Sequence, residues 1–297
     1  MPASRPSRFV PVLAALCALT ALPAVAAIDL DTPAGVLAAN RKIQCSTVDG
    51  KPVTYYWHGH AFSRVPGEPD KRLFKVAGFN VRQCVATEDP ARGKGYRLIS
   101  REILLYMDPA TGEILRTWEN PWTGETVEVL HVANDPVNSA NYVTGRDGKP
   151  ITWQASSEGD AWWQTITVPL FYSNPLTAGY EKYIGGMYHA TEMFNFMGSR
   201  SDLVDESKDT ADIRVGWVRM SDWLPWMQMR GRAGLIYFHT AGTKLASWDD
   251  LPDFMKKEVT KNYPQYTTPP PADDQRPNET SWTYFKKKVE PESGVRH

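Results

Sequence analysis

Apolar and polar residues alternate along most of the chain, in stretches that are divided by Pro-, Gly- and Asp-rich breaks. Alternation with a period of two is typical of β-strands that bury one face, because successive side chains point to opposite sides. Helical patterning is rare and is confined to residues 33–41 and 251–263. The pattern predicts strands over residues 53–65, 73–85, 95–107, 113–118, 125–134, 161–171, 187–196, 213–220 and 233–240.

The same turn occurs twice in the middle of the chain. Asp108-Pro-Ala-Thr-Gly-Glu113 is followed by Asn120-Pro-Trp-Thr-Gly-Glu125. In each copy Pro presets φ for the turn, and Gly supplies a residue that tolerates a positive φ. Alternating stretches flank both turns, so this part of the chain is predicted to form an antiparallel meander.

Many strands in series with short links favour a mainly β fold. We expect an antiparallel lipocalin-like (calycin-type) barrel with few helices, because closure removes the exposed edges of long apolar strands. A β-sandwich is the alternative. One barrel domain is expected over residues 28–265. A Pro-rich, polar C-terminal tail is expected over 266–297, with residues 282–285 returning as a late strand.

The first 27 residues have the features of a signal peptide. Arg5 and Arg8 form a positively charged start, residues 9–22 are mainly apolar, and residues 24–26 match an A-x-A cleavage site. We therefore expect the mature protein in the bacterial periplasm or secreted from the cell, with no transmembrane segment after cleavage. A retained membrane anchor is the alternative.

Composition narrows the range of partners. Removal of the signal leaves Cys45 and Cys84, which predict a disulfide in an oxidising compartment; two buried free thiols are the alternative. The 33 basic and 34 acidic residues give no basic excess, which argues against nucleic acid as a partner. The 11 Trp and 13 Tyr suit a pocket for an apolar or aromatic molecule.

Four stretches of the chain stand out as motifs. They are residues 101–138 (REILLYMDPATGEILRTWENPWTGETVEVLHVANDPVN), 74–80 (FKVAGFN), 192–196 (EMFNF) and 217–227 (WVRMSDWLPWM). Together they resemble the bacterial secreted family known as domain of unknown function 1838. The resemblance covers nearly the whole mature chain. It implies one folded, secreted unit and carries over no catalytic residue.

Polar residues interrupt the apolar faces of five predicted strands. Every second residue of a strand lies on the same face, so parity places these polar groups beside aromatic ones inside the fold. A single inward polar residue is commonly a core group with a backbone partner, whereas five such strands favour a pocket. The titratable residues so placed are His58 and His60 beside Tyr56, His131, Glu192, Arg219 beside Trp217, and His239.

Glu192 is the strongest catalytic candidate. A carboxylate among aromatic side chains is poorly solvated, which favours the neutral form that a general acid needs. His131 and His58 are expected as its proton-transfer partners, and Asp135 is a candidate to orient His131. Arg219 is expected to hold an anion, or alternatively only to compensate the charge of Glu192.

The remaining candidates concern ligand contacts and metal. Trp223 and Trp226 lie between two predicted strands, where they form either an apolar lip over the barrel mouth or a plug in one end. His58 and His60 at i and i+2, with a third histidine such as His131, match a zinc site with an open position. No Glu follows at the spacing of a cupin site, so we expect no metal. The expected ligand-binding residues are Tyr56, His60, His239, Trp217, Trp223 and Trp226.

These features support three hypotheses. The first is a cofactor-independent acid–base enzyme (a lyase, dehydratase, isomerase or hydrolase) acting on a small apolar or aromatic molecule. The second is a non-catalytic carrier of an apolar ligand in the periplasm. The third is a structural protein whose buried polar groups merely pair, which predicts no pocket. A His-liganded metalloenzyme is a further alternative to the first.

Overall fold

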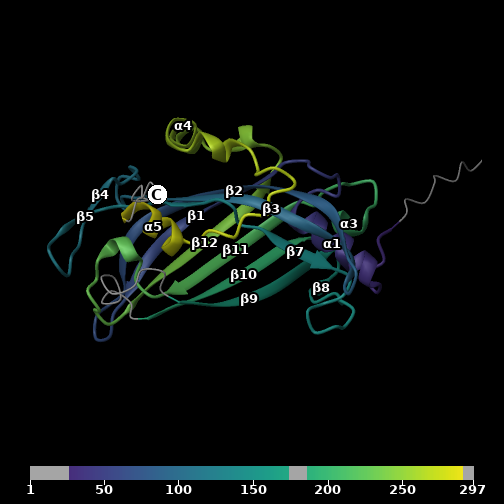
Figure 1. The fold of residues 1–297 in the computed structure, drawn as a ribbon, viewed down its shortest axis with the longest axis horizontal. Coiled ribbons are helices and arrows are strands. Elements are labelled where there is room, and N and C mark those ends of the chain that lie inside the picture. The colour runs from purple at the N-terminus through teal and green to yellow at the C-terminus, as the bar shows by residue number, and fades with distance from the viewer. Residues whose placement is uncertain (1–26, 174–185, 290–297) are drawn as a thin grey trace, which may run out of the picture.

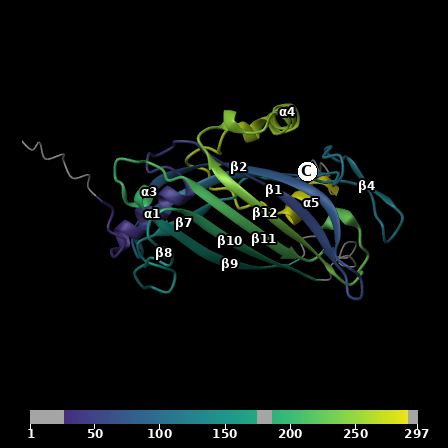
Figure 2. The same ribbon diagram turned by 180° about the vertical axis from the view of Figure 1, so that it is seen from behind.

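A computed structural model of the chain describes residues 27–173 and 186–289. Long strands lie side by side in a curved antiparallel sheet, with helices at its ends and on its outer side (Figures 1 and 2). The mainly β fold expected from the alternation is confirmed. The predicted signal segment up to residue 26 lies outside the described residues, as do residues 290–297 of the tail. Within the described ranges no helix is long and apolar enough to cross a membrane.

The elements follow the predicted order. Every long predicted strand is present, and most extend beyond their predicted ends. The strands are β1 (Val53–Arg64), β2 (Lys71–Asp89), β3 (Gly93–Met107), β4 (Thr117–Glu119), β5 (Thr126–Glu128), β6 (Val132–Asn134), β7 (Ser139–Tyr142), β8 (Ser156–Glu158), β9 (Ala161–Ser173), β10 (Met187–Ser199), β11 (Ile213–Ser221) and β12 (Leu235–Leu245). The helices are α1 (Pro33–Gln44), α3 (Arg200–Val204), α4 (Asp253–Asn262) and α5 (Ser281–Val289).

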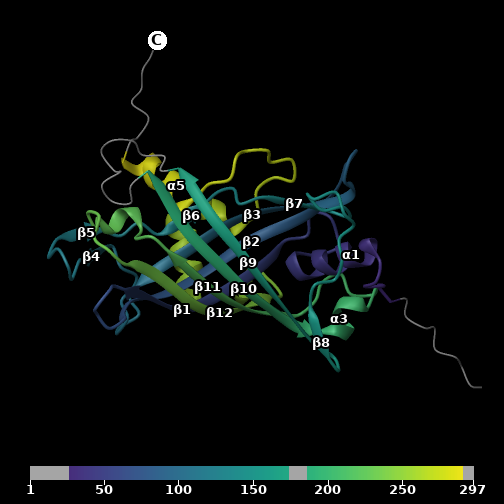
Figure 3. The same ribbon diagram turned by 90° about the horizontal axis from the view of Figure 1, so that it is seen from below.

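The main sheet runs in the order β6-β3-β2-β1-β12-β11-β10-β9-β8, and β7 also pairs with β3. β4 and β5 form a separate pair, joined by the second copy of the repeated turn. Seen from below, β9 and β10 cross β2 and β3 at a steep angle, so two halves of the sheet face each other (Figure 3). No pairing joins β8 or β9 to β3 or β6 within the described residues, so the expected closed barrel is not found.

Strands β2 and β3 are buried on both faces. Their outer side packs against α4, where Phe79 and Leu105 contact the apolar face of the helix through Met255. Their inner side carries Phe74 and Tyr106, which belong to the core inside the curve of the sheet. Double burial removes the alternation between apolar and polar positions, as it does in other strands that are covered on both sides.

A disulfide joins Cys45, at the end of α1, to Cys84 in β2, with the two Cα atoms 5.8 Å apart. The predicted pairing is confirmed. Thr32 caps the start of α1 by accepting a hydrogen bond from the Gly35 N–H at 3.1 Å, and Pro33 occupies its first turn. The disulfide therefore fixes the C-terminal end of a capped helix against the sheet.

Residues 281–289 form the helix α5, not the late strand expected from the sequence. Thr280 and Thr283 exchange hydrogen bonds between their backbone N–H groups and side-chain hydroxyls, which caps the first turn. Trp282 and Phe285 lie three residues apart and are buried on one helix face. The prediction was wrong because a short apolar run has no clear period.

A cluster of tryptophans fills one end of the fold. The ring of Trp226 lies 5.7 Å from that of Phe74, and Trp223 lies 5.3 Å from Trp122. Trp223 Nε1 donates to the carbonyl oxygen of Arg232 at 3.0 Å. Both Trp223 and Trp226 are almost fully buried, so they plug this end and do not form an open lip.

Candidate functional site

A cavity of about 960 Å³ lies inside the curve of the sheet. Residues from β1, β2, β3, β6 and β9–β12 line it, and residues 278–282 of the C-terminal segment complete its wall. The lining combines apolar and aromatic side chains with a large set of polar and charged ones. Its size is typical of pockets that bind small molecules.

One row of cavity residues runs straight across four neighbouring strands. Tyr55 pairs with Asn80, Asn80 with Glu102, and Glu102 with Asn134. Directly opposed residues on one face are in contact, so register alone brings this row together. Asn134 Nδ2 donates to Glu102 Oε1 at 2.7 Å.

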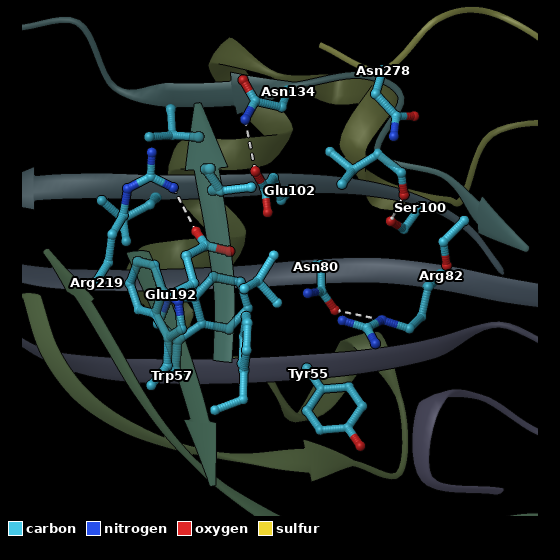
Figure 4. Close-up of a pocket in the computed structure, with 18 of the residues that line it drawn as sticks. Tyr55, Trp57, Asn80, Arg82, Ser100, Glu102, Asn134, Glu192, Arg219 and Asn278 are labelled. Atoms are coloured by element: carbon cyan, nitrogen blue, oxygen red, sulfur yellow. Dashed lines mark hydrogen bonds and ion pairs between the residues drawn. The ribbon is translucent and has the colours of Figure 1, made fainter. Parts of the chain in front are cut away.

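A second row crosses the facing half of the sheet. Glu192 of β10 stands directly opposite Arg219 of β11. Arg219 Nη1 donates to Glu192 Oε1 at 2.5 Å, and its Nη2 donates to the hydroxyl of Tyr188 at 3.1 Å. Glu192 Oε2 has no hydrogen-bond partner among the described residues, and Figure 4 shows the carboxylate facing the space that Glu102 also faces.

Glu102 and Glu192 have different electrostatic surroundings. Burial raises the pKa of Glu102, and the negative charge of Glu192 raises it further, which favours the neutral, proton-bearing form. Burial opposes the charge of Arg219, but Tyr188 and Glu192 outweigh this effect and raise the pKa of Arg219. The cavity thus contains Glu102, which is biased toward its acid form, and Glu192, which forms an ion pair with Arg219; Glu279 also lines it.

Two glycines make room for an aromatic wall. Trp57 pairs across the sheet with Gly78 on one side and Gly242 on the other. A Cβ atom added at Gly78 would come within 2.6 Å of the Trp57 indole, and one at Gly242 within 2.7 Å of the Trp57 side chain. The indole therefore lies flat along the sheet, with its ring 6.3 Å from that of Trp217.

Comparison with protein families shows the family to which the chain belongs. Residues 50–289 match the model of a family described as protein of unknown function (DUF1838). The chain belongs to this family. The match confirms the resemblance inferred from the four motifs. A search of curated proteins finds no match.

In this DUF1838 member the cavity includes three of the residues expected from the sequence. Glu192, Arg219 and Trp217 all line it. Strands β10 and β11 face the interior with the predicted parity, and Glu192 and Arg219 are directly opposed. These residues were predictable because their strands bury one face only.

The expected inward face of β1 and β12 is wrong. His58 and His239 are exposed, and Tyr56 and His60 are partly exposed on the outer side of the sheet. The cavity instead receives the odd-numbered residues of β1 and the even-numbered residues of β12. Aromatic residues occupy both faces of β1, and a register shift at Ala61 further obscures its parity.

His131 is buried, but it lies outside the cavity wall. Its Nδ1 accepts the N–H of Tyr106 at 3.1 Å, and the ring faces a small separate void. Asp135 does not orient it, because Asp135 pairs with Arg101 and Arg276. Trp223 and Trp226 also lie outside the cavity, in the tryptophan plug. None of the residues that line the cavity in the described ranges is a histidine.

The predicted histidines also do not form a metal site. His58 and His60 lie on the outer side of β1, whereas His131 is buried inside the fold. Among the described residues no group of three or more His, Cys, Asp or Glu side chains is close enough to hold a metal ion. The zinc-like spacing of the two β1 histidines therefore gains no third ligand.

Sequence reasoning missed Glu102, Asn134, Asn80 and Arg82. Glu102 shares its parity with Leu104 and lies within the motif of residues 101–138, so the same face argument could have found it. Arg82 and Asn80 lie in β2, where both faces are apolar and parity gives no signal. Because β2 is buried on both faces, the sequence pattern gave no sign of these two polar residues.

His131 should make the protein sensitive to mild acid. Burial, followed by the charge of Arg116, lowers its pKa from 6.5 to about 4. Between these values the unfolded state binds more protons than the folded state, so stability is lost as pH falls from 6.5 to 4. The loss approaches about 3 kcal/mol below this range. We expect His131→Asn, which keeps an acceptor for the Tyr106 N–H, to flatten this dependence.

Urea unfolding at a series of pH values between 4 and 7 measures the effect. His58→Asn is the matched control, because His58 is exposed and should leave the slope unchanged. A slope in His131→Asn equal to that of the wild type would show that the imidazole does not stay neutral in the folded state.

Proposed function

We propose that the protein binds a small apolar or aromatic molecule in its cavity and acts on it by acid–base chemistry, as a lyase, dehydratase, isomerase or hydrolase. The observation that carries this proposal is the meeting of Glu102 and Glu192, from facing halves of the sheet, in one cavity (Figure 4). Pairs of carboxyl groups in contrasting environments divide acid and base roles between them. The chemistry draws on side chains alone, without a metal or other cofactor.

In this proposal Glu102 is the proton donor, because burial raises its pKa and Asn134 holds its Oε1. Glu192 is the proton acceptor through its free Oε2, and Arg219 compensates the negative charge. These roles replace those expected for His131 and His58, which lie away from the cavity. Trp57 and Trp217 supply the surface against which an apolar substrate packs.

The shape of the sheet and the expected compartment support the same proposal. A curved antiparallel sheet around an interior pocket is similar to the lipocalin-like barrel expected from the sequence, a shape that holds apolar ligands. The Cys45–Cys84 disulfide and the signal-like first 27 residues suit the periplasm or the outside of the cell. The presence of a cavity argues against a purely structural role.

A non-catalytic carrier is the second candidate. Glu192 already forms an ion pair with Arg219, and such a pair can serve only to compensate two inward charges. A carrier would hold the same apolar molecule and release it unchanged. The two candidates therefore differ in turnover and not in binding.

Matched Glu→Gln variants separate the candidates. Molecules that co-purify with the protein are identified by mass spectrometry and then returned to wild type, Glu102→Gln and Glu192→Gln. We expect both variants to bind as wild type does and to lose turnover by about a hundredfold or more, as for removal of a general acid or base. Glu158→Gln, at an exposed position on β8, is the control and should turn over normally. Release of the bound molecule unchanged by wild type would favour the carrier.

A further inference from the structure

The cavity has a polar end that the proposed acid–base pair does not use. Arg82 of β2 lies there near Ser100 and Tyr55 (Figure 4), and Gln44 approaches from the end of α1. Arg82 Nε donates to Asn80 Oδ1 at 2.8 Å, and Nη1 donates to Gln44 Oε1 at 2.7 Å. The groups that accept hydrogen bonds from Arg82 are all neutral.

The guanidinium of Arg82 is held firmly but is not fully used. The ring of Tyr55 packs on one of its faces, with Cζ 4.7 Å from the ring centroid. Its third nitrogen, Nη2, has no hydrogen-bond partner among the described residues. Two N–H donors therefore remain on a positioned cation.

Arg82 is also the cation whose charge is not compensated at this site. Glu192 pairs with Arg219, and Glu279 pairs with Lys287, which does not line the cavity. Burial raises the pKa of Glu102 and so weakens its role as a counter-charge. Arg82 is partly buried, and a cation in that setting without a counter-charge is destabilising, so an anionic group beside it would relieve this cost.

We infer that the Arg82 end of the cavity binds the carboxylate of an organic monocarboxylate. The inference rests on the proposed function, because it takes the cavity as the ligand site, and it narrows the substrate class. The carboxylate would accept hydrogen bonds from Nη2, while the apolar or aromatic body lies along Trp57 and Trp217 toward Glu102 and Glu192. One end of the molecule is anchored and the other meets the acid–base pair.

A monocarboxylate fits this end better than a phosphate ester does. One uncompensated cation balances one negative charge, whereas a dianion would bring an excess negative charge close to Glu192 and Glu102. Phosphate sites gather several cationic or backbone N–H donors, whereas Nη2 is the one guanidinium nitrogen of Arg82 that has no partner among the described residues. The apolar and aromatic part of the lining, which includes Trp57 and Trp217, suits the rest of an acid with a hydrocarbon body.

Three probes with the same body test the inference. Naphthalene carboxylate, naphthalene methanol and naphthyl phosphate are titrated calorimetrically into wild type, Arg82→Gln and Arg82→Lys. The matched control is Arg214→Gln, whose arginine is exposed on the outer side of β11. We expect wild type to bind the carboxylate about tenfold or more tightly than the alcohol, the usual effect of a hydrogen bond to a charged group.

Arg82→Gln should lose this preference while binding the alcohol as wild type does, which also shows that its cavity is folded. Arg82→Lys should retain part of the preference, and Arg214→Gln all of it. Equal binding of carboxylate and alcohol by wild type overturns the inference. So does an unchanged preference for the carboxylate in Arg82→Gln, or tighter binding of the phosphate than of the carboxylate by wild type. Carboxylate binding through Arg82 without turnover of any bound acid would contradict the acid–base function and leave this inference standing.

Discussion

Replacing Cys45 and Cys84 together with alanine is expected to lower the free energy of unfolding by about 4 kcal/mol, because the crosslink removes the entropy of a loop of about 40 residues from the unfolded chain. The two cysteines are 39 residues apart in sequence and fully buried. Alanine is chosen because a buried serine hydroxyl would add its own cost. Urea unfolding at neutral pH measures the change.

Reductant provides the control for this prediction. Wild type should lose a similar stability when reduced, whereas the double alanine variant should not respond to reductant. Gln44, which accepts a hydrogen bond from Arg82, directly precedes Cys45, so loss of the crosslink should also weaken the polar end of the cavity. A double variant as stable as oxidised wild type would mean that the packing of α1 alone holds this region.

Trp282→Ala is expected to destabilise the protein by about 4 kcal/mol, as for other large-to-small changes at buried tryptophans. The side chain is 1% exposed, and its ring lies 5.7 Å from that of Tyr188 and 6.3 Å from that of Phe285. It anchors α5 and forms part of the cavity wall. Thermal and urea unfolding would measure the loss, and ligand binding should weaken as well.

A second tryptophan provides the matched control. Trp163 lies on the outer face of β9 and is 42% exposed, so Trp163→Ala should change stability by no more than about 0.5 kcal/mol. If the two variants have similar effects, α5 does not dock on the fold as the packing of Trp282 indicates.

Strand positions could be predicted from the sequence far better than strand faces could. Alternation bounded by Pro and Gly breaks located β1, β10 and β11 to within a few residues. The face of β1 was predicted wrongly because Tyr55 and Trp57 on one side are matched by Tyr56 and Phe62 on the other. Hydrophobicity does not distinguish two aromatic faces, and only the packing of neighbouring strands decides between them.

Some residues of the candidate site could be predicted from the sequence, and others could not. Glu192 and Arg219 stand out in the sequence because each interrupts the more apolar face of its strand. Arg82 belongs to a strand that α4 covers on the outside, so a polar residue there does not mark one side, whereas Glu102 could have been found by its shared parity with Leu104. That Glu102 meets Glu192 depends on the curvature of the whole sheet, which no local pattern contains.

The cavity wall joins Tyr55 of β1 to Trp282 of α5, from opposite ends of the described chain. A nascent chain, made from its N-terminus onward, presents Arg82 and Glu102 long before their facing partners exist. The chamber is complete only when α5 has been synthesised and has docked. Prematurely terminated chains should therefore remain empty, and occupancy by a small molecule would distinguish finished molecules from unfinished ones in a mixture.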